Sequence, residues 1–134
     1  MWVAIWRRWV RLQPAFKVLF FALLSLGIYL GVTSGPSGGY GAAAPLLHAG
    51  GLFTCTILSY LGFPKWRWWF RGGLVFSAGV FIEAAQYFNP RRHADVNDLY
   101  VNAVGVVSAL LLIWAWRAWN HRRNLNYARQ HRHH

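Results

Sequence analysis

The acidic residues of this chain are the side chains best suited to proton transfer or to binding a polar ligand. The sequence of 134 residues contains three Asp and Glu against 14 Lys and Arg. These acids are Glu83, Asp95 and Asp98, and they all lie in one short segment that includes the end of one apolar run and the loop before the next. A carboxylate serves as a general acid or base, and beside arginine it helps to organise a charged binding site. We therefore expect the polar site of the protein in this segment.

Other polar residues extend this segment at helical spacing. Gln86 follows Glu83 by three positions and Asn102 follows Asp98 by four, so each pair shares one helix face. A histidine stands near the start of an earlier apolar run, and a pair of arginines lies between the two polar helix faces. The expected ligand-binding residues are His48, Glu83, Gln86, Arg91, Arg92, Asp95, Asp98 and Asn102.

Several of these residues also have a structural interpretation. Asp95 and Asp98 have the spacing of a helix N-cap and its partner in the first turn. Arg91 favours a lipid headgroup contact, and His48 fits a hydrogen-bonded core residue. Glu83 is hardest to explain structurally, because it is a lone acid inside an apolar run.

The sequence does not decide whether the protein is an enzyme, and it favours a non-enzymatic role. Glu83 and His48 are the candidates for a general acid or base. The sequence has no nucleophile paired with a base, no cluster of metal ligands and no phosphatase-type signature, so we expect neither a metal nor another cofactor. The single cysteine, Cys55, lies in an apolar run, where we expect it to pack.

Composition indicates a membrane protein. Hydrophobic residues make up 56% of the chain and aromatic residues 18%, with nine Trp, whereas charged residues make up 13%. The net charge is +11, but long apolar runs separate short basic clusters, which is the membrane pattern and not that of a nucleic-acid-binding domain. We therefore expect membrane lipids as partners and no nucleic acid; the sequence does not identify protein partners.

The apolar runs predict an all-α membrane bundle of about four transmembrane helices. The spans are expected at about 15–32, 44–63, 70–88 and 99–119, within a transmembrane domain over 15–119. Residues 1–14 form a basic, Trp-rich segment that either lies in the membrane interface or simply flanks the first span. Residues 120–134 form a basic cytoplasmic tail. The first span is expected to be an uncleaved helix, although a cleaved signal peptide is the alternative.

Glycines in these spans predict close helix contacts. Gly50 and Gly51, with Thr54, make one small-residue face in the second span, and Gly105 has the same role in the fourth.

Charge predicts the orientation. Twelve of the 14 Lys and Arg lie before or at the edge of the first span, in the second loop or in the tail, and the other two lie in the third loop. Because basic residues favour the cytoplasm, both termini are expected inside and the first and third loops outside. This topology brings His48, Glu83, Asp98 and Asn102 to one outer face, within about a dozen ångströms in depth at 1.5 Å per residue.

The polar segment resembles the VanZ-like family of small bacterial membrane proteins. The resemblance covers residues 44–109 and includes a histidine near the start of the second span, His48. Ala44 and Pro45 stand where that family often has an Asp-Lys pair. The motif residues are Glu83, Gln86, Pro90, Arg92, Asp95, Asp98, Asn102 and Gly105.

The resemblance implies a multi-pass protein of the bacterial plasma membrane with a link to the cell envelope. The founding member of the family is associated with resistance to the glycopeptide antibiotic teicoplanin. Three hypotheses follow: an envelope factor that binds an anionic lipid or lipid-linked precursor, a membrane enzyme that acts on a lipid-linked substrate, and a purely structural membrane subunit. The first is preferred, because basic residues adjoin a polar site at headgroup depth.

Overall fold

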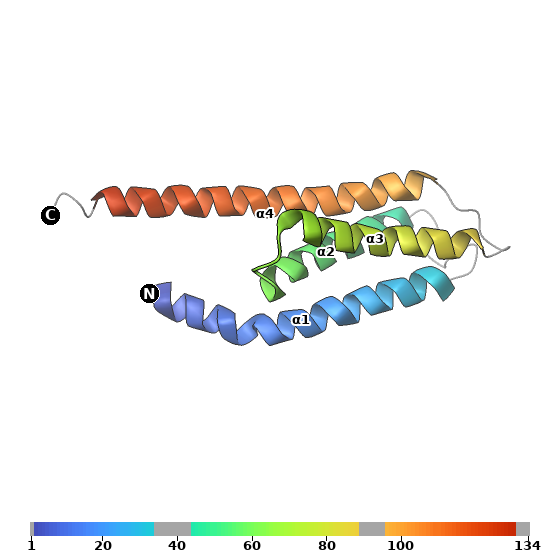
Figure 1. Ribbon diagram of the computed structural model, residues 1–134, viewed down its shortest axis with the longest axis horizontal. Coiled ribbons are helices and arrows are strands. Elements are labelled where there is room, and N and C mark those ends of the chain that lie inside the picture. The colour runs from blue at the N-terminus through green and yellow to red at the C-terminus, as the bar shows by residue number, and fades with distance from the viewer. Residues whose placement is uncertain (1, 34–43, 89–95, 131–134) are drawn as a thin grey trace.

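The chain folds into four antiparallel helices. The computed structural model describes residues 2–33, 44–88 and 96–130. The helices are α1 (Trp2–Thr33), α2 (Ala44–Gly62), α3 (Trp68–Tyr87) and α4 (Val96–Gln130). The start of α1, the α2–α3 connection and the end of α4 lie toward one end of the molecule, as Figure 1 shows. The other helix ends meet at the opposite end, so the expected all-α arrangement is confirmed.

The helix bounds agree with the expected spans inside the bundle and differ at both termini. α1 includes most of the expected basic segment 1–14, and α4 continues into the expected tail as far as Gln130. Pro14 lies inside α1, where it cannot donate a backbone hydrogen bond. Figure 1 shows α1 bent in its first half, which is the expected consequence of an internal proline. The side chains of residues 2–8, and with them the interfacial role of this segment, lie outside the described residues.

The core is a small group of buried side chains to which all four helices contribute. Phe20 of α1, Leu52 and Cys55 of α2, Val75 of α3 and Val106 of α4 are buried together. The expectation that Cys55 packs is therefore confirmed. Large apolar side chains are nevertheless exposed along every helix. Such a surface is costly in water but favourable against lipid.

Two helices meet the length and hydropathy expected of a membrane span. These segments are Trp9–Thr33 of α1 and Asn97–Tyr127 of α4. α2 and α3 have 19 and 20 residues and form the other half of the bundle, but in the part of the chain that the structure describes neither contains a stretch as long and as apolar as these two segments. α2 carries glycines and a histidine, and α3 carries Arg71, Glu83 and Gln86.

Close backbone contact joins α2 to α4. A Cβ atom added at Gly105 of α4 would overlap the carbonyl oxygen of Ala49 in α2. Glycine is therefore required at this position, which confirms the close packing expected there. Gly72 of α3 is similarly covered by the side chain of Leu110 in α4, whose Cδ1 would lie 2.8 Å from an added Cβ.

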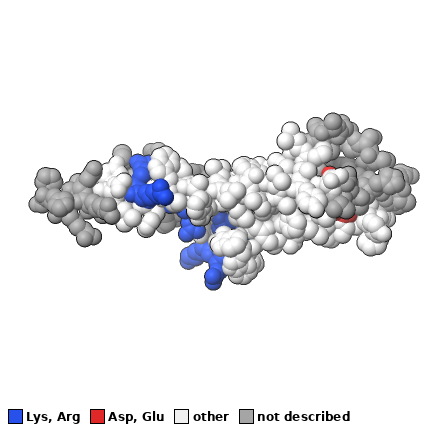
Figure 2. All heavy atoms as spheres, turned by 90° about the horizontal axis from the view of Figure 1, so that it is seen from above, with Lys and Arg blue, Asp and Glu red and all other residues white. Residues whose placement is uncertain are grey.

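Charge is divided between the two ends of the molecule. Figure 2 shows the described Lys and Arg on the side of the molecule where α1 begins and α4 ends. The described Asp and Glu lie toward the opposite end. We call the end that holds Glu83 and Asp98 the polar end. The other part of the molecule, which extends from Lys17, Arg71 and Arg117 beside the α2–α3 connection to the end of α4, is the basic end.

Arg71 stabilises the basic end from within. Its side chain is 2% exposed, and Nη2 donates to the carbonyl oxygens of Phe63 and Trp66, each at 3.0 Å. The guanidinium also lies 5.1 Å from the ring centroid of Tyr60. Arg71 therefore closes the α2–α3 connection, a role that charge counting along the sequence missed.

Candidate functional site

A cavity of about 470 Å³ lies between the four helices and reaches the polar end. Its walls are mostly leucine, isoleucine and glycine from α1 and α2, with smaller contributions from α3 and α4. The polar side chains that line it are His48, Thr54 and Asn102. Thr54 donates to the carbonyl oxygen of Gly50 at 2.8 Å, which satisfies its hydroxyl group. The cavity is therefore an apolar pocket with a small number of polar groups, which is the usual composition of a small-molecule site.

Asn102 is the most unusual residue of this cavity. Its side chain is 0% exposed, and among the described residues neither Nδ2 nor Oδ1 has a hydrogen-bond partner. A buried amide without partners costs about 1–3 kcal/mol, so such groups are rare in folded proteins. The Asn102 amide therefore offers one donor group, Nδ2, and one acceptor, Oδ1, to a ligand in the cavity.

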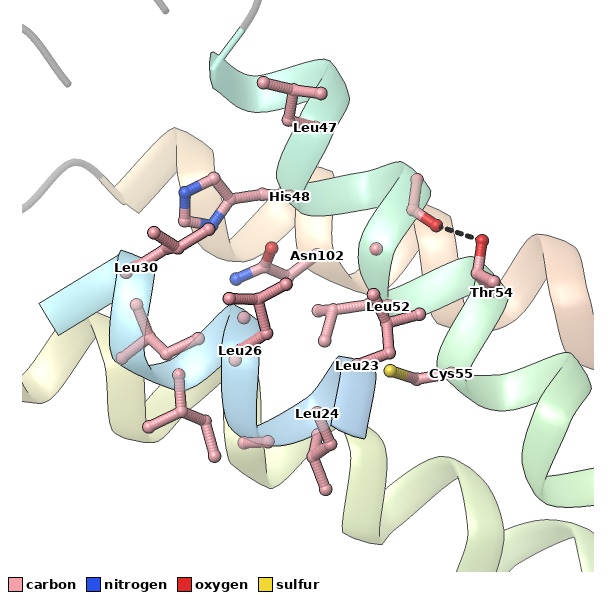
Figure 3. Close-up of a pocket in the computed structure, with 18 residues that line it drawn as sticks. Leu23, Leu24, Leu26, Leu30, Leu47, His48, Leu52, Thr54, Cys55 and Asn102 are labelled. Carbon is pink, nitrogen blue, oxygen red and sulfur yellow. Dashed lines mark hydrogen bonds between the residues drawn. The ribbon is translucent and has the colours of Figure 1, made fainter. Parts of the chain in front are cut away.

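His48 of α2 contributes to the same part of the cavity. Figure 3 shows its ring and the amide of Asn102 projecting toward the same region, beside Leu26 and Leu30 of α1. The side chain of His48 is half-buried. Helix depth alone predicts that these two residues lie at one outer face. In the structure both line the same cavity.

Two cavity glycines of α2, Gly50 and Gly51, do not form the close contacts expected of them. A Cβ atom added at Gly50 or Gly51 would meet nothing within 4 Å, and the same is true of Gly27 in α1. The expectation of tight helix contact at Gly50 and Gly51 is therefore wrong. The missing side chains leave open space because both residues face the cavity and not a neighbouring helix.

Glu83 is buried on the inner face of α3. Its side chain is 6% exposed, and it shares this face with Gly79, Ile82 and Gln86. Gly79 contacts Asn102 so closely that an added Cβ would lie 3.0 Å from Nδ2. Glu83 follows Gly79 by one helical turn, and Gly79 is covered by Leu52 of α2 as well as by Asn102, so Glu83 lies on the face of α3 that packs against α2 and α4.

Gln86 joins the end of α3 to the end of α1. Its Nε2 donates to the carbonyl oxygen of Gly31 at 2.7 Å, and both groups are buried. The last carbonyls of a helix lack intrahelical donors, and α1 ends at Thr33, so this bond satisfies one of them. The side chain of Ile82 covers Gly31 beside the bond, with Cγ2 placed 2.6 Å from where a Cβ would stand.

We predict that Gln86→Leu lowers the free energy of unfolding by about 1–3 kcal/mol, because the buried carbonyl of Gly31 then loses the hydrogen bond that Gln86 donates. Unfolding in detergent, followed by circular dichroism, measures this loss. Tyr87→Leu, at the exposed neighbouring position, is the control and should be close to neutral. Unchanged stability together with weaker lipid binding in Gln86→Leu would instead make Gln86 a ligand residue.

The remaining expected residues divide between described and undescribed positions. Asp98 lies half-buried in the first turn of α4, where a carboxylate interacts favourably with the helix dipole. Arg91, Arg92 and Asp95 lie outside the described residues. The described residues contain no group of three or more His, Cys, Asp or Glu side chains placed to hold a metal ion.

Comparison with known proteins gives one match. A protein-family model described as VanZ/LLP1 matches residues 1–117, which include α1 as well as all eight expected site residues. No curated protein and no solved structure matches the chain significantly. The family match and the two long apolar helices fit a membrane protein.

Proposed function

Because this chain belongs to the VanZ/LLP1 family, we propose that it is a multi-pass protein of the bacterial plasma membrane. Its polar end binds the headgroup of an envelope lipid or of a lipid-linked envelope precursor. All four helices cross the membrane, with both termini and the α2–α3 connection in the cytoplasm. The concentration of described Lys and Arg at the basic end supports this orientation, because basic residues favour the cytoplasmic side.

The observation that carries the proposal is the convergence of buried polar side chains at the polar end. Glu83 and Asn102 are 6% and 0% exposed, in a bundle whose outer surface is largely apolar. Ionisable and amide groups at membrane depth are costly and are usually retained for a function. Arg91 and Arg92 follow the end of α3 by four and five positions in the sequence, and we propose that their positive charges bind an anionic headgroup.

The proposal predicts that Glu83→Gln and Arg92→Ala lose a specific lipid that the wild-type protein retains. Each substitution removes one charge from the proposed headgroup site. Native mass spectrometry of the purified protein measures retained lipid, and a thermal melt of each variant is recorded beside it. Arg67→Ala is the matched control, because it removes an exposed arginine at the basic end.

Two outcomes would count against a headgroup site. One is equal retention of the same lipid by wild type and both variants. The other is an early melt of both variants with no specific lipid on the wild type, which would make the polar end chiefly architectural. The Gln86–Gly31 hydrogen bond is the contact that favours such a structural role, since it joins two helices without any ligand.

Two finer points belong to the same proposal. The association of the founding family member with teicoplanin resistance extends to this chain only through family membership. An enzymatic role for Glu83 or His48 on a lipid-linked substrate requires turnover that Glu83→Gln abolishes and Cys55→Ala preserves.

A further inference from the structure

We propose that the cavity between the helices receives the hydrocarbon chain of a membrane lipid, and that Asn102 hydrogen-bonds a neutral hydroxyl or amide group of the same lipid. This inference rests on the proposed function, since the lipid chain continues inward from the headgroup at the polar end. The proposal identifies a membrane lipid as the class of ligand in the cavity and Asn102 as a residue that binds it.

The direction and depth of the cavity fit a lipid chain. Along α2 its lining extends from Leu47 to Cys55, and along α1 from Gly31 back to Leu23. At 1.5 Å per residue, each wall covers about 12 Å of helix. The cavity therefore runs parallel to the helix axes from the polar end inward, which is the direction of lipid chains around a membrane-spanning bundle.

The cavity also has access from the side of the bundle. Leu26 of α1 and Leu47 of α2 line it and are half or more exposed, at 51% each. Gly50 and Thr54 are exposed on the same side of α2. A chain could thus enter between α1 and α2 from the lipid without crossing water, whereas a polar solute would have to leave water to reach this opening.

Asn102 defines the polar group that the ligand must carry. Neither its Nδ2 nor its Oδ1 has a partner within residues 2–33, 44–88 and 96–130, so Nδ2 can take an acceptor and Oδ1 a donor from a ligand. A hydroxyl or an amide supplies both, whereas a bare hydrocarbon or an ester supplies at most one. The amide lies beside His48, near the start of α2, so the matching group belongs to the headgroup end of the lipid, where phosphatidylglycerol carries the hydroxyls of its headgroup glycerol.

The glycines of the wall provide a way to close the cavity without disturbing the helices. An added Cβ at Gly51 or Gly27 meets no atom within 4 Å, so a leucine there occupies the space proposed for the lipid. Gly73 of α3 is exposed, lies outside the cavity and is equally open to an added Cβ. Gly73→Leu therefore has the same effect on helix propensity with no effect on the cavity.

The test uses the full chain in vesicles of phosphatidylglycerol that carries a diazirine near the end of one acyl chain. After illumination, mass spectrometry maps the cross-linked residues. We expect adducts on the buried or half-buried cavity residues Leu23, Leu24 and Cys55, with a several-fold decrease in Gly51→Leu and no decrease in Gly73→Leu. Gly27→Leu, on the opposite wall, should reproduce the decrease and serves if Gly51→Leu fails to fold.

Two results would overturn the proposal. Adducts confined to exposed residues such as Phe21 and Leu112 would indicate bulk lipid contact and a cavity that holds only water. Cavity adducts of equal yield in both cavity-filling variants would place the chain elsewhere. Glu83→Gln and Arg92→Ala separate this proposal from the headgroup site. If both variants retain the wild-type lipid and the cavity residues are still cross-linked, the headgroup site is rejected and the cavity proposal stands.

Discussion

Gly105→Ala is expected to lower the free energy of unfolding by about 1–3 kcal/mol, the usual range for an overpacked contact. The added methyl group would overlap the carbonyl oxygen of Ala49, and a backbone atom cannot move aside without moving its helix. α2 would have to withdraw from α4 where the two are packed most closely. The change would also alter the cavity, because His48 lies on α2 one position before Ala49 and Asn102 lies on α4 three positions before Gly105.

The matched substitution at Gly73 should have the opposite sign. Gly73→Ala replaces an exposed helical glycine with nothing near the added Cβ, so it should stabilise α3 by up to about 1 kcal/mol through helix propensity. Unfolding of both variants in the same detergent, followed by circular dichroism, gives the comparison. Equal effects at the two positions would show that α2 and α4 are not held together at Gly105.

Hydrophobic length is sufficient to predict the helical core of the chain. The second and third apolar runs, 44–63 and 70–88, have bounds close to the observed ends of α2 and α3. The outer ends of α1 and α4 were not predicted. Basic, Trp-rich sequence is compatible with a helix inside or outside the membrane, so composition alone does not show where such a helix ends.

The candidate site was predicted in its residue types but not in its contacts. The spacing of Glu83 and Gln86 correctly placed both on one face of α3, and both are buried. The same spacing does not reveal that Gln86 donates to Gly31, because that partner is 55 positions away. Nor does it distinguish Gly105, which touches a neighbouring backbone, from Gly51, which faces open space. Such differences arise from the placement of helices relative to one another, which helix periodicity leaves undetermined.

Asn102→Leu is expected to abolish the stabilisation that a bound lipid gives to the protein while leaving the lipid-free protein at least as stable. Leucine has the same number of side-chain heavy atoms and the same branch point as asparagine, and it removes two buried polar atoms that lack partners among the described residues. In lipid-free detergent the free energy of unfolding should therefore stay constant or rise by about 1–3 kcal/mol. A ligand at free concentration L that binds only the folded state raises the free energy of unfolding by RT ln(1 + L/Kd), so wild type should gain stability on addition of phosphatidylglycerol and the variant should not.

The two conditions together distinguish a ligand residue from a structural one. Unfolding curves of wild type and Asn102→Leu are measured with and without phosphatidylglycerol in mixed micelles. Asn124→Leu makes the same exchange at an exposed position of α4 near the basic end and should keep the full lipid response. A loss of stability in Asn102→Leu without lipid would mean that the amide has a structural partner in the folded protein. Retention of the full lipid response would mean that the bound lipid does not reach Asn102, because a hydrogen bond at a fully buried site cannot be removed without changing the affinity.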